Sequence, residues 1–404
     1  MSTSLLYHAL NIVGYRYRST EYVGKEIIFT IEQDPGSLQC ACCGSRKVSK
    51  RGATWRRFLA PGFAFKRIVI RLAVPRVECR VCAVVRQVKI GFAEENRRFI
   101  RQFERCVLDL SSHMTIQDVA QHCGVSWDVV KNIQKRYLKR KFSCPRLKGL
   151  RRIAIDEIYV GKKRKFLTIV LDLETGAVVF VGEGKGAAAL EPFWKRLKSA
   201  RKRIEAVAID MSQAYIQAVT TNLPKAVLVF DHFHVIKLFN EKLSDLRREL
   251  FRQAQDQQLK DVLKGTRWLL LMNPEHLDPD RDEQQRLDKA LKLNAPLATA
   301  YYLKEDLRQL WQQPNWRTAR KYLTSWCKRA MASGIGILQQ FARTLQKHAQ
   351  GILNYFKFPI STGPLEGTNN KIRTMQRQAY GFRDYQFFIL KIYALHEARY
   401  ASAG

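Results

Sequence analysis

The sequence predicts a multidomain α+β protein, with small N-terminal modules ahead of a larger core of strands and helices. At 404 residues the chain is well above the usual size of one domain. The predicted secondary structure changes along the chain from β-rich runs to short helices, then to alternating strands and helices, and then to a long helical stretch. Its 70 Lys and Arg residues outnumber its 36 Asp and Glu residues, for a formal net charge of +34. That excess indicates a polyanion, most often nucleic acid, although charge alone also allows a ribosomal or membrane-surface role.

Residues 1–90 mix β-rich runs with turn residues, and their cysteines predict a zinc-ribbon-like module. Two CxxC pairs can supply four thiolates to one tetrahedral Zn²⁺ site. The four ligands would be Cys40, Cys43, Cys79 and Cys82. Cys42 could replace a neighbour as a ligand, and the alternative interpretation is a set of small buried or redox-active cysteines. We expect one structural Zn²⁺ ion and a role in docking on DNA or on a partner.

Residues 91–148 are expected to form a helix-turn-helix domain that binds DNA. Thr115 can cap a first helix, Gly124 supplies the turn and Ser126 can cap a second helix. Opposite its apolar face, the second helix carries the kind of donors that a recognition helix needs in the major groove. These residues are Trp127, Lys131, Asn132, Lys135 and Arg136. An ordinary helical hairpin with a solvated basic face is the alternative.

From residue 149 the chain predicts strands and helices in the order βββαβαβ, which is that of a ribonuclease-H-like α/β core. The runs IAIDEIYV, FLTIVLDL and AVVFVGEG are joined by tight connections, which suits an antiparallel meander. The runs IEAVAID and AVLVFDHF each follow helical sequence, as in parallel crossover units. We expect residues 149–236 to form the first part of the core, residues 237–355 an all-α insertion, and residues 356–404 the final helix of the core.

Acidic residues from distant segments are candidates for a metal site in this core, because phosphoryl transfer on DNA needs them to converge on two divalent ions. Asp156 lies within an apolar strand, where an unpaired carboxylate is costly. Glu157 should point to the opposite face of the sheet. Asp210 ends an apolar strand, at the edge where crossover sheets place ligands, although a helix N-cap is the ordinary explanation. Glu366 falls in the first turn of a predicted helix, and the helix dipole alone would favour a glutamate at that position.

The helix that carries Glu366 is expected to pack one face on the sheet and to offer the other to DNA. The apolar stripe consists of Leu365, Thr368, Ile372, Met375 and Ala379. The polar stripe consists of Glu366, Asn369 or Asn370, Arg373 and Arg377. This polarity suits a nuclease site better than a simple helix cap.

A further acidic cluster follows the next strand. Asp231 ends that strand and His234 lies three residues further on. Spacing alone cannot decide whether Asp210 or Asp231 is the second metal ligand. His232 and His234 could instead be structural, which is the more common role of a lone histidine.

Together these motifs resemble the ISL-three family of insertion-sequence transposases, and the resemblance covers nearly the whole chain. The motifs are IAIDEIYV, the LDLETG hairpin, AIDMSQAY, VFDHFHVIKLFN, LKGTRWLLL and LEGTNNKIRTMQRQAYGFRDYQFF. The resemblance implies a DDE transposase whose ribonuclease-H-like core is interrupted by a helical insertion before the final glutamate, as in the related Mutator and hAT transposases.

Carried over by position, the resemblance implies Asp156, Asp210 and Glu366 as catalytic ligands of two Mg²⁺ ions, for which Mn²⁺ could substitute. Asp231 and His234 would form an accessory motif, with Asp231 as second ligand as the alternative. Trp268 lies in the insertion where related enzymes place an aromatic ring against DNA bases, and stacking is physically reasonable. A core tryptophan is the more ordinary interpretation of that residue.

We therefore expect metal-dependent cleavage at the ends of an insertion sequence and strand transfer into target DNA. The expected partners are the terminal inverted repeats, the target DNA and further copies of the chain in a homodimer or higher oligomer. A DNA-binding regulator or architectural protein with an inert core, and a nuclease without strand transfer, are the alternatives. No signal peptide is apparent and no apolar run approaches the roughly 20 residues that span a bilayer. We expect a bacterial cytoplasmic, nucleoid-associated protein with no membrane partner.

Overall fold

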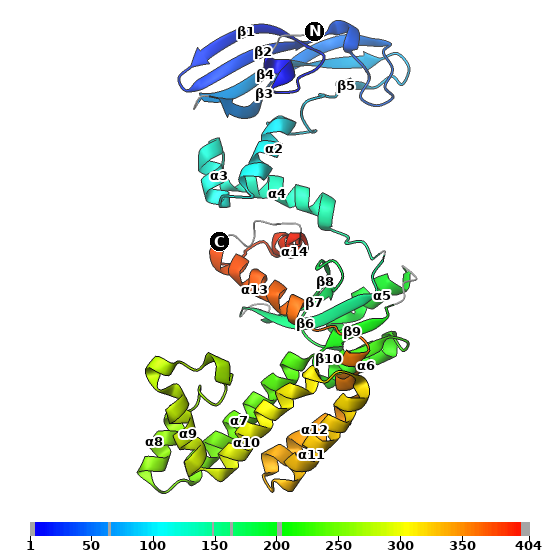
Figure 1. Cartoon of the computed structure of the whole chain (residues 1–404). Coiled ribbons are helices and arrows are strands. Elements are labelled where there is room, and N and C mark those ends of the chain that lie inside the picture. Colours follow the sequence, from blue (N-terminus) through cyan, green and yellow to red (C-terminus); the bar gives the residue numbers. More distant parts are fainter. Residues whose placement is uncertain (1–4, 64–65, 148, 162–164, 200–203, 397–404) are drawn as a thin grey trace. The chain divides into compact units, whose positions relative to one another are not determined.

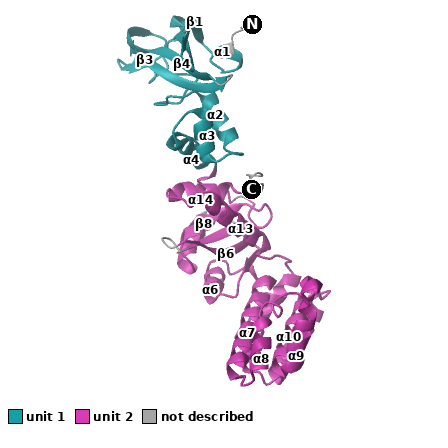
Figure 2. Cartoon of the chain, turned by 90° about the vertical axis from the view of Figure 1, so that its left-hand side faces the viewer, with its two compact units in different colours: residues 1–141, 400–404 teal, residues 142–399 magenta. Residues whose placement is uncertain are grey.

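The computed structural model describes residues 5–63, 66–147, 149–161, 165–199 and 204–396 (Figure 1). The chain divides into two compact units, Met1–Lys141 and Phe142–Arg399, which Figure 2 shows in different colours. Each unit has its own hydrophobic core. Within the described residues, no helix combines the length and the apolar character needed to cross a membrane.

Unit 1 contains a five-stranded sheet with the order β1-β2-β4-β3, in which β5 also pairs with β4. The β2–β4 pair is parallel and the other pairs are antiparallel. The strands are β1 (Tyr15–Val23), β2 (Glu26–Gln33), β3 (Val48–Phe63), β4 (Lys66–Cys79) and β5 (Val85–Gln87). The helices are α1 (Leu5–His8), the short 3-10 helix η1 (Pro35–Ser37), α2 (Arg101–Leu110), α3 (Ile116–Cys123) and α4 (Trp127–Phe142).

The central strand β4 supplies much of the core of unit 1, because one of its faces carries only apolar residues along its middle part. Ile68, Ile70 and Leu72 are almost fully buried, as the two-residue period of a strand requires for one face. Phe103 of α2 and Val119 of α3 belong to the same apolar cluster. The β module and the helices that follow it therefore share one hydrophobic core.

Unit 2 is built on a mixed sheet with the order β10-β9-β6-β7-β8. The β6–β7 and β7–β8 pairs are antiparallel, whereas β9 is parallel to both β6 and β10. The strands are β6 (Arg152–Gly161), β7 (Lys165–Asp172), β8 (Val178–Glu183), β9 (Ala206–Ile209) and β10 (Val227–Phe230). Between strands lie the 3-10 helix η2 (Ala187–Leu190), α5 (Glu191–Ser199) and α6 (Gln213–Asn222). The expected meander and the two parallel crossovers are confirmed by this pairing.

A helical segment separates β10 from the C-terminal helices, and its first helix starts directly at the end of the strand. Its α-helices are α7 (His232–Gln253), α8 (Gln257–Gly265), α9 (Glu283–Leu293), α10 (Ala295–Arg308), α11 (Trp316–Ala332) and α12 (Gly336–Leu353). Its 3-10 helices are η3 (Pro274–His276), η4 (Pro279–Arg281), η5 (Gln309–Gln312) and η6 (Asn354–Phe356). Figure 1 shows α7, α10, α11 and α12 running alongside one another, and the rings of Phe239, Trp326 and Phe341 meet edge to face between them.

The end of this helical segment returns to the sheet at β10. A Cβ atom added at Gly351 would lie 2.4 Å from the ring of Phe230, so only glycine allows this approach of α12 to the strand. The Nδ2 atom of Asn354 donates a hydrogen bond of 2.7 Å to the carbonyl of Leu228. The chain is thereby delivered back to the sheet before the last two helices, α13 (Gly363–Gln378) and α14 (Tyr385–Ala394), which pack on β6 and β8 respectively.

Candidate metal centres and nucleic-acid interface

Three aspartates share one row across the parallel strands of unit 2: Asp210 and Asp231 directly follow β9 and β10, and Asp156 lies in the middle of β6. Ala154 of β6 pairs with Ala208 of β9, and continuing this register by two residues sets Asp156 beside Asp210. Phe230 of β10 pairs with Ile209, and the next residue, Asp231, donates its N–H to the carbonyl of Ile209 at 3.1 Å. Neighbouring strands are about 4.8 Å apart and residues in register share a face. The row therefore gathers three carboxylates on one face of the sheet.

Asp156 is partly buried against α13. The Nδ2 atom of Asn369 donates a hydrogen bond of 3.0 Å to Oδ2 of Asp156. Burial raises the pKa of Asp156, the N–H of Glu157 and the nearby His234 oppose this rise, and Asp210 adds to it. Asp210 and His234 thus lie close enough to act electrostatically on Asp156, and a bound cation would favour its charged form.

Glu157 lies on the other face of β6, as strand alternation predicts. The hydroxyl of Tyr215 donates a hydrogen bond of 2.6 Å to Oε1 of Glu157, and the N–H of Gly186 donates to the same atom at 3.2 Å. The same hydroxyl lies 3.2 Å from Oγ1 of the buried Thr168. Glu157 is therefore held in a polar network between β6, β7 and α6, away from the face that carries Asp156.

Asp210 and Asp231 occur in different surroundings. Asp210 is partly exposed, and its Oδ1 atom accepts one hydrogen bond of 3.0 Å from the N–H of Ser212. The side chain of Asp231 is fully buried. Both its oxygens accept hydrogen bonds from Thr362, Oδ1 from the N–H at 3.2 Å and Oδ2 from the hydroxyl at 2.9 Å. Because Thr362 directly precedes α13, Asp231 fastens the start of that helix to the end of β10.

Glu366 lies in the first turn of α13 and is partly exposed. Asn369 follows it by three residues, so that both side chains lie on neighbouring parts of one helix face. Further along, Nε2 of Gln376 donates to the carbonyl of Val160 in β6 at 3.2 Å. The structure thus brings the helix of Glu366 onto the strand of Asp156. Within the described residues, however, the three expected catalytic carboxylates do not form a group in which one oxygen from each lies within 4.8 Å of the others.

The faces of α13 differ in part from the sequence prediction. Leu365 and Ile372 are buried, as expected. Ala379 is exposed and follows the helix, so its assignment to the packed stripe is wrong. Asn369, grouped with the DNA-facing residues as an alternative to Asn370, is only 2% exposed and packs toward the sheet. The residues left exposed on α13 include Asn370, Arg373 and Arg377.

The expected helix-turn-helix is present in unit 1 as α3 and α4. Oγ1 of Thr115 accepts a hydrogen bond from the N–H of Asp118 at 3.2 Å, which caps α3. Gly124 ends α3 with a φ of +62°, a conformation that glycine adopts without strain. Val119 and Val130 are fully buried between the helices. Local capping and turn residues therefore predicted this element correctly.

On the expected recognition face of α4, some side chains are exposed and others are paired with residues of unit 1. Trp127 and Asn132 are exposed. Lys131 forms an ion pair of 3.3 Å with Asp128 and lies 5.2 Å from the ring centre of Trp127. The guanidinium of Arg136 forms a 2.8 Å ion pair with Glu104 of α2, and Lys135 is partly buried. Arg136 thus has a partner within unit 1, which sequence spacing could not reveal because Glu104 lies on another helix.

Four cysteines of unit 1 lie close enough to share one metal ion. The Sγ atoms of Cys40, Cys43, Cys79 and Cys82 are all within 4.8 Å of one another. Those of Cys40 and Cys82 are 3.6 Å apart, and those of Cys43 and Cys79 are 3.5 Å apart. A Zn²⁺ ion with four thiolates at about 2.3 Å sets its sulfurs about 3.8 Å apart, so the group could bind zinc. Cys42 is exposed and lies outside this group.

The two CxxC pairs share one backbone geometry. The N–H of Gly44 donates to the carbonyl of Cys40 at 3.0 Å, and that of Ala83 donates to the carbonyl of Cys79 at 2.9 Å. Gly44 and Ala83 both have positive φ, +73° and +53°. Each pair is therefore a tight turn that aims both sulfurs to one side, which is typical of a thiolate metal site.

Backbone N–H groups also favour the thiolate form of the first cysteine in each pair. Those of Cys43 and Cys42 lower the pKa of Cys40 to about 6. The N–H of Cys82 is the main cause that lowers the pKa of Cys79. The pKa values of Cys43 and Cys82 are instead raised by burial and by the neighbouring thiols, so the spacing of the four sulfurs carries the case for a metal site.

Trp268 is not a core residue, contrary to the more ordinary interpretation of the sequence. It is 65% exposed, and the guanidinium of Arg267 lies 4.7 Å from its ring centre. Lys304, which is almost fully buried, holds the turn that carries Trp268 through hydrogen bonds to its backbone. The Nζ atom of Lys304 donates to the carbonyls of Leu270 and Met272 at 2.9 and 3.0 Å. An aromatic ring is thus presented to solvent on a firmly held turn.

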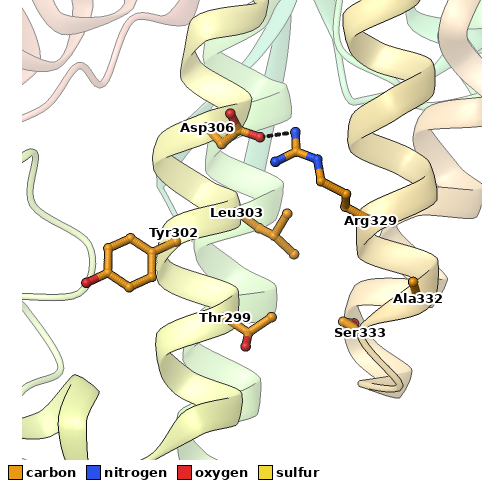
Figure 3. A pocket seen from close by; sticks show the side chains of 7 residues that line it. All are labelled: Thr299, Tyr302, Leu303, Asp306, Arg329, Ala332 and Ser333. Atoms are coloured by element: carbon orange, nitrogen blue, oxygen red, sulfur yellow. Dashed lines mark hydrogen bonds and ion pairs between the residues drawn. The ribbon is translucent and has the colours of Figure 1, made fainter.

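A shallow pocket between α10 and α11 is distinct from these features (Figure 3). It is lined by Thr299, Tyr302, Leu303, Asp306, Arg329, Ala332 and Ser333. Figure 3 shows Arg329 reaching across to pair with Asp306. The hydroxyl of Tyr322 also donates to that carboxylate. With its one acid neutralised by a cation, the pocket offers no cluster of metal ligands.

Sequence reasoning missed three residues that shape these sites: Asn369, Thr362 and Lys304. Asn369 was named only as an alternative on the DNA-facing stripe, and the other two carried no signal. Each forms a hydrogen bond with a partner in another element: Asn369 with Asp156, Thr362 with Asp231, and Lys304 with the turn that carries Trp268. Only the tertiary fold brings such pairs together.

A helix-turn-helix element indicates a protein that binds DNA, and a row of aspartates on a mixed sheet is an arrangement with which enzymes that cut DNA hold divalent metal ions. Comparison with known families agrees. A family model described as a transposase, of the ISL3 DDE type, matches residues 153–392, and one described as the helix-turn-helix domain of transposase family ISL3 matches residues 88–138. The chain therefore belongs to the ISL3 (ISL-three) family, and it is a DNA transposase of the DDE type.

Curated relatives extend this similarity over almost the full length. The transposase for insertion sequence element IS1001 of Bordetella parapertussis is 32% identical over 390 residues, which cover 94% of this chain and 95% of the relative. The transposase for IS1557 of Mycobacterium tuberculosis is 27% identical over 377 residues, which cover 87% of this chain and 84% of that relative. The transposase expected from the sequence is thereby confirmed over a DNA-binding regulator with an inert core.

Proposed function

We propose that residues 149–236 and 356–404 form a ribonuclease-H-like catalytic core in which Asp156, Asp210 and Glu366 hold two Mg²⁺ ions, with residues 237–355 inserted between the two parts. The strand order and directions of the sheet in unit 2 support this fold. The observation that carries the proposal is the hydrogen bond from α13 to Asp156, because it brings the helix of Glu366 onto the carboxylate row.

The residues at this site suit Mg²⁺, with Mn²⁺ able to take its place. Carboxylate and amide oxygens are the hard ligands that these ions prefer. When bound, the two ions would activate the attacking oxygen and stabilise the leaving oxygen. The chain itself orients the ligands: Asn369 holds Asp156, a local turn holds Asp210, and the Asp231–Thr362 pair sets the start of α13.

The reaction that we propose has two steps. Water first attacks a phosphodiester at an end of the element, the bond from phosphorus to the 3′-oxygen breaks, and a 3′-hydroxyl and a 5′-phosphate are left. That 3′-hydroxyl then attacks a target phosphodiester in line, forming a new ester and displacing the 3′-oxygen of the target. The first step acts on the element's terminal inverted repeats, and the second joins them to target DNA. Pairing two ends requires a homodimer or a higher oligomer.

A cleavage and joining assay with purified protein tests this function. Labelled DNA bearing the ends of the element is incubated with Mg²⁺ and target DNA, once intact and once with the 3′-hydroxyls already exposed. We expect both substrates to be joined to target. If the DNA is only nicked and neither substrate is joined to target, the protein is a nuclease without strand transfer.

We propose Asp210 and not Asp231 as the second ligand, because both oxygens of Asp231 are already used by Thr362 in a fully buried pair. Asp231→Asn is expected to cost about 1–3 kcal/mol of stability through one lost hydrogen bond, and to slow strand transfer less than tenfold. Asp210→Asn should abolish strand transfer without unfolding the protein. Thermal unfolding and the joining assay measure both effects. Activity that survives Asp210→Asn but not Asp231→Asn would reverse the assignment.

For DNA recognition we propose that the zinc-ribbon-like module of residues 1–90, with one Zn²⁺, and the helix-turn-helix domain of residues 91–148 bind the terminal repeats. Among the α4 side chains, Trp127 and Asn132 are the exposed candidates for base contacts, and Lys131, Lys135 and Arg136 would act through phosphates. On α13, exposed Asn370, Arg373 and Arg377 would hold the phosphodiester beside the carboxylate row.

Trp268 is proposed to stack on a DNA base, supported by its exposure and by the guanidinium beside its ring. Trp268→Ala should change the free energy of unfolding by less than about 0.5 kcal/mol, because an exposed side chain is removed. It should weaken binding of DNA with unpaired bases by about 1–3 kcal/mol. Fluorescence anisotropy with such DNA measures the effect, and Tyr302→Ala, another exposed aromatic of the same helical segment, is the control. Equal affinity of Trp268→Ala and wild type would remove the stacking role.

A further inference from the structure

Asn369 is a buried polar residue in contact with Asp156, and its hydrogen bonding is incomplete. It is 2% exposed, and its Nδ2 atom donates to Oδ2 of Asp156 at 3.0 Å. This contact fixes the orientation of the amide, because an ionised carboxylate can only accept. Its other polar atom, Oδ1, is also buried and has no hydrogen-bond partner among the described residues. A buried amide oxygen without a partner is rare in folded proteins and calls for a ligand, an ion or a water molecule.

The position of Asn369 indicates which ligand this would be. It lies on the face of α13 that meets β6, three residues after Glu366 and directly against Asp156. Asp156 in turn is the neighbour of Asp210 across the sheet by register. The amide thus joins the helix that carries one proposed ligand to the strand that carries another. Asp156 contacts the amide directly, Asp210 is next to Asp156 by register, and Glu366 precedes Asn369 by three residues on α13, so a cation is the species that this place favours.

We infer that Asn369 is a further member of the divalent-metal site. Its amide N–H holds Oδ2 of Asp156, which leaves Oδ1 of Asp156 to bind the cation. Its own carbonyl oxygen binds the same hard cation or a water molecule on it. This inference rests on the proposed function of Asp156. It differs from a purely structural role, in which the amide would only fasten α13 to β6 and metal affinity would not depend on it.

Mn²⁺ binding to the zinc-loaded full chain, without DNA, tests this inference by calorimetry or by the electron paramagnetic resonance of free Mn²⁺. We expect Asn369→Ala to raise the Mn²⁺ dissociation constant by about ten- to a hundredfold, the range found when residues that orient metal ligands are removed. Asn370→Ala is the matched control, because Asn370 is the exposed neighbour on the same helix. It should change the constant less than twofold. A folded Asn369→Ala variant with wild-type Mn²⁺ affinity would overturn the inference.

A second variant covers the case in which Asn369→Ala does not fold. Asn369→Asp keeps the size of the side chain but replaces the donor with a second carboxylate beside Asp156. We expect it to be less stable than wild type without Mn²⁺ and to gain more in melting temperature than wild type when Mn²⁺ is added. A gain no larger than that of wild type would also overturn the inference, because repulsion between carboxylates would then not be relieved by a bound cation.

The Asp156→Asn variant distinguishes a failure of this inference from a failure of the proposed function on which it rests. If Asp156→Asn loses Mn²⁺ binding while Asn369→Ala keeps it, the metal site stands and only the role of Asn369 fails. If Asp156→Asn binds Mn²⁺ as wild type does, the proposed site itself fails and the inference fails with it.

Discussion

Asp156→Asn is expected to reduce DNA cleavage and strand transfer by at least about a thousandfold, which corresponds to about 4 kcal/mol of lost transition-state stabilisation. The substitution preserves the shape of the side chain but removes the charge that would bind the cation. Because Asp156 is only partly buried and Asn keeps one oxygen that can accept a hydrogen bond, the fold should persist. Asp210→Asn and Glu366→Gln should cause losses of the same order. Single-turnover cleavage with Mg²⁺ and with Mn²⁺ measures them.

Glu174→Gln is the matched control for these variants. Glu174 is an exposed acid in the turn between β7 and β8 of the same sheet, outside the carboxylate row. It should cleave and join DNA within about twofold of wild type. DNA binding by all four variants should also stay close to wild type, since the helix-turn-helix lies in unit 1. An Asp156→Asn protein that retains a tenth or more of the cleavage rate would contradict the assignment.

Loss of the cysteine site is expected to have the largest effect on stability. The two CxxC turns tie the segment before β3 to the connection between β4 and β5, so the metal would join parts of unit 1 that are distant in the chain. Cys79→Ser should lower the free energy of unfolding of the zinc-loaded protein by about 4 kcal/mol or more, as loss of a structural metal does. Thermal unfolding and the zinc content of the purified protein measure this effect.

Cys42→Ser provides a closely matched control, because Cys42 lies in the same turn, is exposed and is outside the group of four. It should keep one zinc per chain and the melting temperature of wild type. A chelator should lower the melting temperature of wild type to that of Cys79→Ser. Equal losses from Cys42→Ser and Cys79→Ser, or a Cys79→Ser protein that keeps its zinc and stability, would contradict a four-cysteine metal site.

Features with a local cause could be predicted from the sequence. Thr115 and Gly124 bound a helix by capping and by a left-handed turn, and both effects involve only neighbouring residues. The two-residue period of a strand placed Asp156 and Glu157 on opposite faces, and their partners Asn369 and Tyr215 agree. The paired cysteines were predicted by spacing, and their sulfurs do meet.

Features that depend on approach of distant segments could not be predicted. The Asp231–Thr362 pair joins residues on either side of the helical segment, and no spacing rule covers such a separation. Periodicity assigned Ala379 to the packed face of α13, but the helix ends before it. Trp268 precedes a run of apolar residues in the sequence and is nevertheless exposed, and the hydrogen bond from buried Lys304 to Leu270 in the same turn joins residues that are distant in the chain.

A crystal structure of the protein bound to its element's ends, with Ca²⁺ in place of Mg²⁺ to prevent cleavage, tests the central claim most directly. The account predicts carboxylate oxygens of Asp156, Asp210 and Glu366 about 2.3–2.6 Å from the bound ions, next to the phosphodiester at the end of the element. It also predicts that Asp231 stays paired with Thr362. Ions held by Asp231 in place of Asp210, or a Glu366 that remains out of reach of any ion in the DNA complex, would contradict it.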